Sequence, residues 1–187
     1  KSINPDCKII TTVAHLRPVK GVDYLIQAAK LLEEFDDLHF VFIGKGTDTN
    51  QFQQKISKLS NSYRLHGLGD IEDIRPHIKA CDIYVQPSIS EGLAKTLIEA
   101  MAYSKPIIAT RSGGPQEIIK AEVSGKLVPV KDPKAIAKAI IELNSNYKYA
   151  NKLGESANIF LLRELKIEST IKKTLEVYKT ILKVSQG

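Results

Sequence analysis

Short apolar runs rich in β-branched residues alternate along this chain with longer segments whose apolar residues recur every three or four positions. The run KIITTVA at Lys8–Ala14 predicts a β-strand, and Lys20–Phe35 has the spacing of an amphipathic helix. Later runs predict strands at Leu38–Ile43, Tyr63–His66, Asp82–Gln86, Pro106–Thr110 and Gly125–Val130. The segments between them predict helices at Thr49–Leu59, at Ile74–Ala80, at Gly92–Tyr103, from Gly113 onward, and at Lys134–Leu143.

This alternation predicts an α/β fold, a doubly wound Rossmann-like parallel sheet of about six strands with flanking helices on both faces. The strands read as continuous apolar runs, as strands buried on both faces do. After the last strand only helical patterns follow, at Tyr147–Phe160 and Lys166–Leu182. The length of 187 residues fits a single domain, 1–187, with C-terminal helices at about 147–183.

The composition narrows the function classes. Lys and Arg number 27 against 21 Asp and Glu. The net charge of +6 suits phosphates, other polyanions or an anionic membrane surface, and it equally suits an ordinary soluble surface. The chain has no Trp and few aromatic residues among its cations, which argues against nucleic acid as a partner. Cys7 and Cys81 form no Cys-x-x-Cys motif, so we expect no zinc ribbon, no disulfide framework, and a cytoplasmic location.

Open parallel sheets bind ligands at the carboxyl ends of their strands, so the residues after each strand are candidates for a binding site. His15, Arg17 and Lys20 follow the first predicted strand. Two cations there can clamp phosphates, or they can be surface charges of a loop. Gly44 and Gly46 follow the second strand. They lack the third glycine of a dinucleotide fingerprint and the sequence of a P-loop, so they predict either a ligand-contacting loop or a tight turn.

Two carboxylates follow the fourth predicted strand. Glu91 lies at the strand exit and Glu99 eight positions later, roughly 12 Å further along a helix that begins at Gly92. The start of such a helix offers unpaired amides and a positive dipole end, which suit a pyrophosphate. A nucleotide sugar is long enough to place its hexose on one carboxylate and its ribose on the other. Taken alone, the two residues also fit an acidic helix start and a solvated glutamate.

In chain order, these motifs resemble the C-terminal, donor-binding domain of the retaining glycosyltransferases of family 4 (group 1), which have the GT-B fold. The resemblance covers about residues 8–143 and rests on seven segments with the family's order and spacing. The segments are KGVDYLIQA at 20–28, FIGKG at 42–46, LHG at 65–67, ACDIYVQPS at 80–88, the Glu91 and Glu99 pair, KPIIAT at 105–110 and GGPQEI at 113–118.

The resemblance implies a hexosyltransferase that uses a nucleotide-diphosphate sugar and retains the configuration of the transferred sugar. Uridine is the family's commonest base. The expected role is the biosynthesis of cell-surface glycan or polysaccharide. Glu91 would contact the hexose hydroxyls, while Arg17 and Lys20 would bind the diphosphate and stabilise its departure. Because these cations would replace a divalent ion, the resemblance implies no metal and no cofactor. The chain has no Asp-x-Asp motif.

The same resemblance assigns the rest of the donor site. Glu99 would bind the ribose, and the main chain near His66 would meet the base. The other expected contacts are the amides of Gly92, Leu93, Ala94 and Lys95 on the diphosphate, Gly44 and Gly46 along the cleft, and His15 beside the diphosphate. Two positions depart from the family's pattern: Ala-His15-Leu stands where Gly-Arg-Leu is common, which moves the cation to Arg17, and Ala94 replaces a common glycine.

The acceptor would bind an N-terminal Rossmann-like domain that is missing from this chain, so we expect donor binding without efficient turnover. The C-terminal helices would brace that domain, and without it they would expose Ile171, Leu175, Tyr178 and Leu182. The inner face of an anionic membrane is an expected place of action. A nucleotide-sugar epimerase on the same fold and a non-catalytic nucleotide-binding module remain open alternatives.

Overall fold

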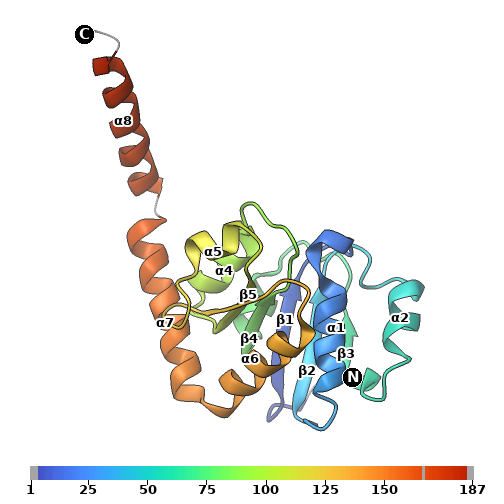
Figure 1. The fold of residues 1–187 in the computed structure, drawn as a ribbon. Coiled ribbons are helices and arrows are strands. Elements are labelled where there is room, and N and C mark those ends of the chain that lie inside the picture. The colour runs from blue at the N-terminus through green and yellow to red at the C-terminus, as the bar shows by residue number, and fades with distance from the viewer. Residues whose placement is uncertain (1–3, 166, 185–187) are drawn as a thin grey trace.

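In the computed structural model the chain forms one six-stranded parallel sheet in the order β3-β2-β1-β4-β5-β6, with helices on both faces (Figure 1). The structure describes residues 4–165 and 167–184, and in the last helix it places the side chains of residues 171 and 174–181. The strands are β1 (Lys8–Val13), β2 (Leu38–Ile43), β3 (Leu65–Gly67), β4 (Ile83–Gln86), β5 (Ile107–Thr110) and β6 (Lys126–Val128). The sheet expected from the sequence is therefore confirmed.

The helices occupy the segments between and after the strands. They are α1 (Val22–Leu31), α2 (Asn50–Ile56), α3 (Arg75–Ala80), α4 (Lys95–Ala102), α5 (Gly114–Ile118), α6 (Pro133–Ser145), α7 (Tyr147–Glu164) and α8 (Ile167–Val184), with 3₁₀ turns η1 (Pro18–Lys20) and η2 (Ser62–Arg64). Side-chain caps fix several starts: Thr49, Asp132 and Asn146 accept from amides of the first turns of α2, α6 and α7.

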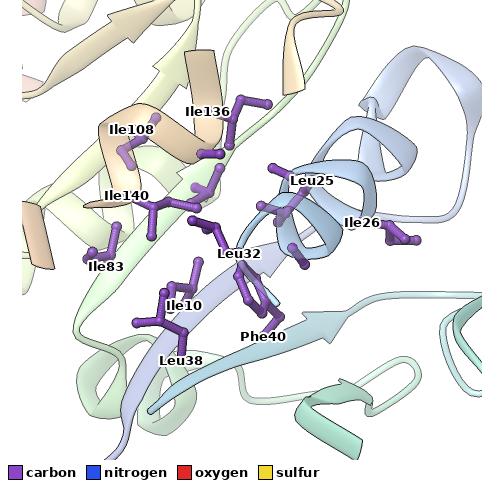
Figure 2. Packing of buried hydrophobic residues seen from close by; sticks show 14 of the residues in the cluster. Ile10, Leu25, Ile26, Leu32, Leu38, Phe40, Ile83, Ile108, Ile136 and Ile140 are labelled. Atoms are coloured by element: carbon purple, nitrogen blue, oxygen red, sulfur yellow. The ribbon is translucent and has the colours of Figure 1, made fainter. Parts of the chain in front are cut away.

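The core lies in two layers because successive strand residues point to opposite faces of the sheet. On one face, α1 and α6 pack on the strands, as Figure 2 shows. The labelled residues of this layer are Ile10, Leu25, Ile26, Leu32, Leu38, Phe40, Ile83, Ile108, Ile136 and Ile140. On the other face, Tyr84 and Ile107 pack against α4 and α7 through Leu97, Met101 and Ala157. Together the layers hold the carboxyl ends of the strands at one edge of the sheet.

Most element boundaries differ from the sequence prediction by one to four residues, and three of the differences have a clear local cause. The first helix begins at Val22, not Lys20, because Gly21 has a left-handed conformation with φ of +64° that ends the preceding 3₁₀ turn. The helix after β4 begins at Lys95, so Glu91 lies outside the helix and the expected separation of Glu91 and Glu99 along one helix axis is wrong. The third strand begins at Leu65, since the predicted strand's first residues belong to η2.

The C-terminal helices run across and then away from the sheet. Helix α7 packs against α4, where a Cβ at Gly154 would lie 2.0 Å from the Ser104 carbonyl oxygen. Helix α8 projects from the body of the domain (Figure 1). Ile171, Leu175 and Tyr178 are at least half exposed on it, as expected, while the Leu182 side chain and Lys166 lie outside the described residues. Within the described ranges, no helix has the length and apolarity to cross a membrane.

Candidate functional site

The carboxyl ends of β1, β2 and β4 surround a hollow of about 320 Å³. It opens beside the junction of β1 and β4, where the strand order reverses and open α/β sheets bind their ligands. The loops after these strands, the loop before α3 and the start of α4 supply its walls. The lining residues are Val13, Ala14, His15, Lys20, Ile43, Gly44, Asp70, Ile71, Ile74, Gln86, Glu91, Leu93, Ala94, Lys95 and Thr96.

A lysine and a glutamate meet in this hollow. Lys20 Nζ lies 2.7 Å from Glu91 Oε2, although 71 positions separate the two residues in the sequence. The Glu91 side chain is 10% exposed and that of Lys20 is 27% exposed, so the pair is shielded more than a surface ion pair. The fold thus places one cation and one carboxylate together at the open end of the sheet.

Two loop contacts bring the pair together. The Ile89 amide donates to the Val19 carbonyl oxygen over 2.8 Å, which joins the loop after β4 to the turn after β1. Gly21 lies against the same loop, and a Cβ there would stand 2.0 Å from the Pro87 carbonyl oxygen. Only glycine permits both the positive φ and this close approach, which explains the Lys-Gly pair in the sequence.

Glu91 is held at both its side chain and its backbone. Its Oε2 also accepts from Ser88 Oγ over 3.0 Å and from Gln86 Nε2 over 3.2 Å. Its amide donates to the Ser112 carbonyl oxygen, and its own carbonyl oxygen accepts from the Gly114 amide, both over 2.8 Å. The loop after β5 therefore supports the loop that carries Glu91, and the carboxylate keeps one position.

The start of α4 faces the hollow without a side-chain cap. Ala94 occupies the cap position and its side chain supplies no hydrogen bond. Leu93 is 65% exposed and Gly92 has no atom within 4 Å of where a Cβ would stand. Ala94, Leu93 and Lys95 line the hollow. An uncapped helix start beside a lysine is a suitable environment for an anion, as a diphosphate would require.

The structure separates the cations that follow β1. His15 lines the hollow, and its Nδ1 accepts from the Lys45 amide over 3.1 Å. In the neutral ring this leaves Nε2 as the donor. Arg17 lies instead in a neighbouring hollow between the start of α1 and α2, beside Asp23 and Lys55. The paired role expected for Arg17 and Lys20 therefore stays a prediction. Of these two cations, Lys20 is the one that contacts Glu91.

Glu99 lies in the second turn of α4 and is half-buried. Its Oε2 is enclosed and has no hydrogen-bond partner among the described residues. This oxygen is closed to a ligand in the present arrangement, and Glu99 is not among the residues that line the hollow. The ribose contact expected for Glu99 therefore stays a prediction.

The His66 side chain does not line the hollow and packs against His39 instead. Its ring stacks on His39 with 5.2 Å between centroids, and His39 Nδ1 and His66 Nε2 are 2.9 Å apart. Burial lowers the pKa of His66, and the neighbouring His39 ring lowers it further. The chain beyond this strand does reach the hollow: the Gly44 amide donates to the Gly69 carbonyl oxygen over 2.7 Å, and Asp70 lines the wall.

The two glycines after β2 have different places. Gly44 lines the hollow with φ of +135°, and a Cβ there would lie 2.4 Å from the Ala14 carbonyl oxygen. Gly46, with φ of +99°, packs against Leu16 behind the hollow. The loop after β2 is thus packed tightly against the residues that follow β1, and it also supplies part of the wall.

Three polar residues of the hollow were not predicted from the sequence. Gln86, Thr96 and Asp70 all line the hollow, and none was singled out as a binding residue. The sequence does contain an indication for Gln86, because a glutamine at the end of an otherwise apolar buried strand needs a hydrogen-bond partner. Across the described part of the chain, no three His, Cys, Asp or Glu side chains are grouped as metal ligands.

The comparisons with known proteins identify the family. A family model described as "Glycosyl transferases group 1" matches residues 1–159. The chain belongs to this family. The putative glycosyltransferase EpsD of Bacillus subtilis is 32% identical over 175 residues, which is 93% of this chain and 46% of EpsD. The chain spans about half the length of the first curated relatives that it matches.

Solved structures share the fold. The C-terminal domain of LpcC from Francisella tularensis matches with a TM-score of 0.76 and 28% identity, over 86% of this chain and 87% of that domain. Anabaena HepE, solved with UDP-glucose, matches with a TM-score of 0.80 over 92% of this chain and 49% of HepE. At 24% identity that likeness shows the fold alone. The sheet is therefore one half of the GT-B architecture.

Proposed function

We propose that this chain is the donor-binding half of a retaining hexosyltransferase and that it binds a UDP-sugar in the hollow at the carboxyl ends of β1, β2 and β4. The observation that carries the proposal is the ion pair of Lys20 and Glu91 at 2.7 Å beside the uncapped start of α4. One part of this site suits a diphosphate and the other suits sugar hydroxyls. Family membership and the UDP-glucose bound by HepE support the choice of ligand.

The charges of the site favour departure of the diphosphate. As the bond between the sugar C1 and the diphosphate oxygen breaks, negative charge grows on the leaving group. Lys20 and the first amides of α4 are fixed before the reaction, so they stabilise this charge without reorganising. The acceptor hydroxyl attacks C1 on the same face and passes its proton to the departing phosphate oxygen, which retains the configuration.

The two carboxylates divide the recognition of the donor. Glu91 accepts from hydroxyls of the hexose, because its side chain lines the hollow and is fixed in place. Glu99 accepts from the ribose through Oε1, because its Oε2 is enclosed. His15 contributes a neutral Nε2 donor beside the diphosphate.

The acceptor is held by a second, N-terminal Rossmann-like domain that faces this hollow. The exposed apolar side chains of α8, among them Ile171, Leu175 and Tyr178, cover part of that domain. We propose that the complete enzyme acts in the cytoplasm, at the inner face of the membrane, on cell-surface glycan. Without the second domain, this chain binds its donor and turns it over weakly.

Calorimetric titration of the chain with UDP, GDP and ADP tests the proposal. We expect UDP to bind most tightly. We expect Lys20→Met to weaken UDP about tenfold or more, because it removes a charge-assisted contact with the diphosphate, and Glu99→Ala to weaken it by loss of the ribose contact. Lys55→Met is the matched control, since Lys55 pairs with Asp23 outside the hollow. A folded chain that binds none of the three nucleotides, or that loses as much affinity in Lys55→Met, refutes the proposal.

A further inference from the structure

A chain of polar side chains joins β4 to the start of α4, and two of its members, Gln86 and Thr96, line the hollow. Tyr84 and Gln86 lie on β4 and are 0% and 2% exposed, and Thr96 lies in the first turn of α4. Tyr84 Oη is 3.0 Å from Gln86 Oε1 and 2.7 Å from Thr96 Oγ1, and Thr96 Oγ1 is 3.5 Å from Gln86 Oε1. Neighbouring positions of this strand hold apolar side chains, so the polar chain is a local exception in the core.

These contacts fix which way the Gln86 amide points. Its Oε1 faces two hydroxyls that can donate, while its Nε2 faces Ser88 Oγ at 2.9 Å and Glu91 Oε2 at 3.2 Å. The reversed amide would set Oε1 against the Glu91 carboxylate, oxygen against oxygen, and would give Tyr84 no acceptor on the glutamine. Burial raises the pKa of the Tyr84 phenol, so it keeps its proton and remains a donor.

The amide contributes to an unequal arrangement at Glu91. Three donors, from Lys20, Ser88 and Gln86, converge on Oε2. The other oxygen, Oε1, has no partner among the described residues and is not enclosed. The carboxylate is therefore held by one oxygen and presents the other one to the hollow that it lines.

We propose that Gln86 is a positioning residue for donor recognition: held by Tyr84 and Thr96, its amide fixes Glu91 Oε2 so that Oε1 meets the sugar of the donor. The inference rests on the proposed function, and it adds a residue that acts on the sugar through Glu91. Because Gln86 acts through Glu91, its loss reduces recognition of the sugar and leaves recognition of the nucleotide unchanged.

Gln86→Met is the decisive variant. Methionine has nearly the volume of glutamine and cannot hydrogen-bond as an amide does, so the core stays filled. Tyr84 and Thr96 can still bond to each other at 2.7 Å, which leaves no hydroxyl of this pair orphaned. Thr12→Val is the matched control, a buried polar-to-apolar change on β1 at a side chain outside the hollow.

The experiment is calorimetric titration of the chain and its variants with UDP, UDP-glucose, UDP-galactose and UDP-N-acetylglucosamine. For the UDP-sugar that binds most tightly, we expect Gln86→Met to lose about tenfold in affinity while UDP changes less than twofold. In a Glu91→Ala background, Gln86→Met should cause no further loss, because the two residues act as one unit. Tyr84→Phe should show the same sugar-selective loss at smaller size, and it serves as the test if Gln86→Met does not fold.

The other outcomes separate the two proposals. If UDP and the UDP-sugar weaken equally in Gln86→Met, or if the losses of Gln86→Met and Glu91→Ala simply add, Gln86 is a packing residue and the inference fails alone. It fails as well if UDP binds but no UDP-sugar binds more tightly than UDP. If the wild-type chain binds no nucleotide, the proposed function fails and the inference falls with it.

Discussion

Replacing Gly21 by alanine tests the contact that brings the two halves of the site together. Gly21 has φ of +64°, and a Cβ there would stand 2.0 Å from the carbonyl oxygen of Pro87 and 2.9 Å from its carbonyl carbon. Both atoms belong to the backbone, so no side chain can rotate away. The loop after β1 must therefore separate from the loop after β4, and Lys20 must move away from Glu91.

The magnitude follows from three contributions. The left-handed conformation costs alanine roughly 1–2 kcal/mol. Overpacking against a rigid neighbour costs about 1–3 kcal/mol more. The smaller entropy of the unfolded alanine chain offsets about 0.4–1 kcal/mol. We expect Gly21→Ala to lower the free energy of unfolding by roughly 2–4 kcal/mol, and the melting temperature of a chain of this size by about 5–15 °C.

Urea unfolding followed by circular dichroism measures this change, and Gly92→Ala is the control. Gly92 lies in the loop between β4 and α4, and nothing lies within 4 Å of where its Cβ would stand. We expect Gly92→Ala to change the free energy of unfolding by less than about 0.5 kcal/mol. Equal unfolding midpoints for the two variants would show that the contact between Gly21 and Pro87 does not hold the loops, and the reasoning would be refuted.

Three further predictions concern buried groups elsewhere. Thr12→Val should raise the free energy of unfolding by about 1 kcal/mol, since the Thr12 hydroxyl is enclosed without a partner among the described residues. Urea unfolding measures this change, and a loss of stability would contradict the prediction. Burial raises the pKa of Cys81 to about 12, so Ellman's reagent at pH 8 should modify the half-buried Cys7 in the folded chain and Cys81 only after unfolding. Burial lowers the pKa of His66 in the folded state, so the unfolded state takes up the proton first and stability should fall as the pH drops below about 6.5. His66→Gln should lessen that fall in urea midpoints between pH 7 and pH 5, and an unchanged pH dependence would refute it.

The sequence determined the elements of this fold because their patterns are local. The apolar β-branched runs at β1, β2, β4 and β5 are typical of strands buried on both faces, and the structure places all four at the centre of a parallel sheet. Helix starts were less well predicted. A pattern of apolar residues shows which face of a helix is buried, but the start of α1 depends on the conformation of Gly21, and that of α4 on the loop after β4.

Part of the site could also be predicted, since the carboxyl ends of parallel strands meet at one edge of the sheet. That rule put Lys20, Glu91, Gly44 and His15 into one hollow, and the structure places all four in its lining. The rule gives the edge but not the direction of each side chain. It therefore could not show that Arg17 lies in a neighbouring hollow beside α2.

Only the tertiary structure decided which partners each polar group has. Gln86 reads in the sequence as the end of a strand, and its contacts with Thr96 and Glu91 exist because β4 ends beside the start of α4. The ion pair of Lys20 and Glu91 likewise spans 71 positions and depends on the approach of Gly21 to Pro87. Periodicity along a chain reports burial, whereas hydrogen bonds and ion pairs between distant segments depend on distances that only the packed fold sets.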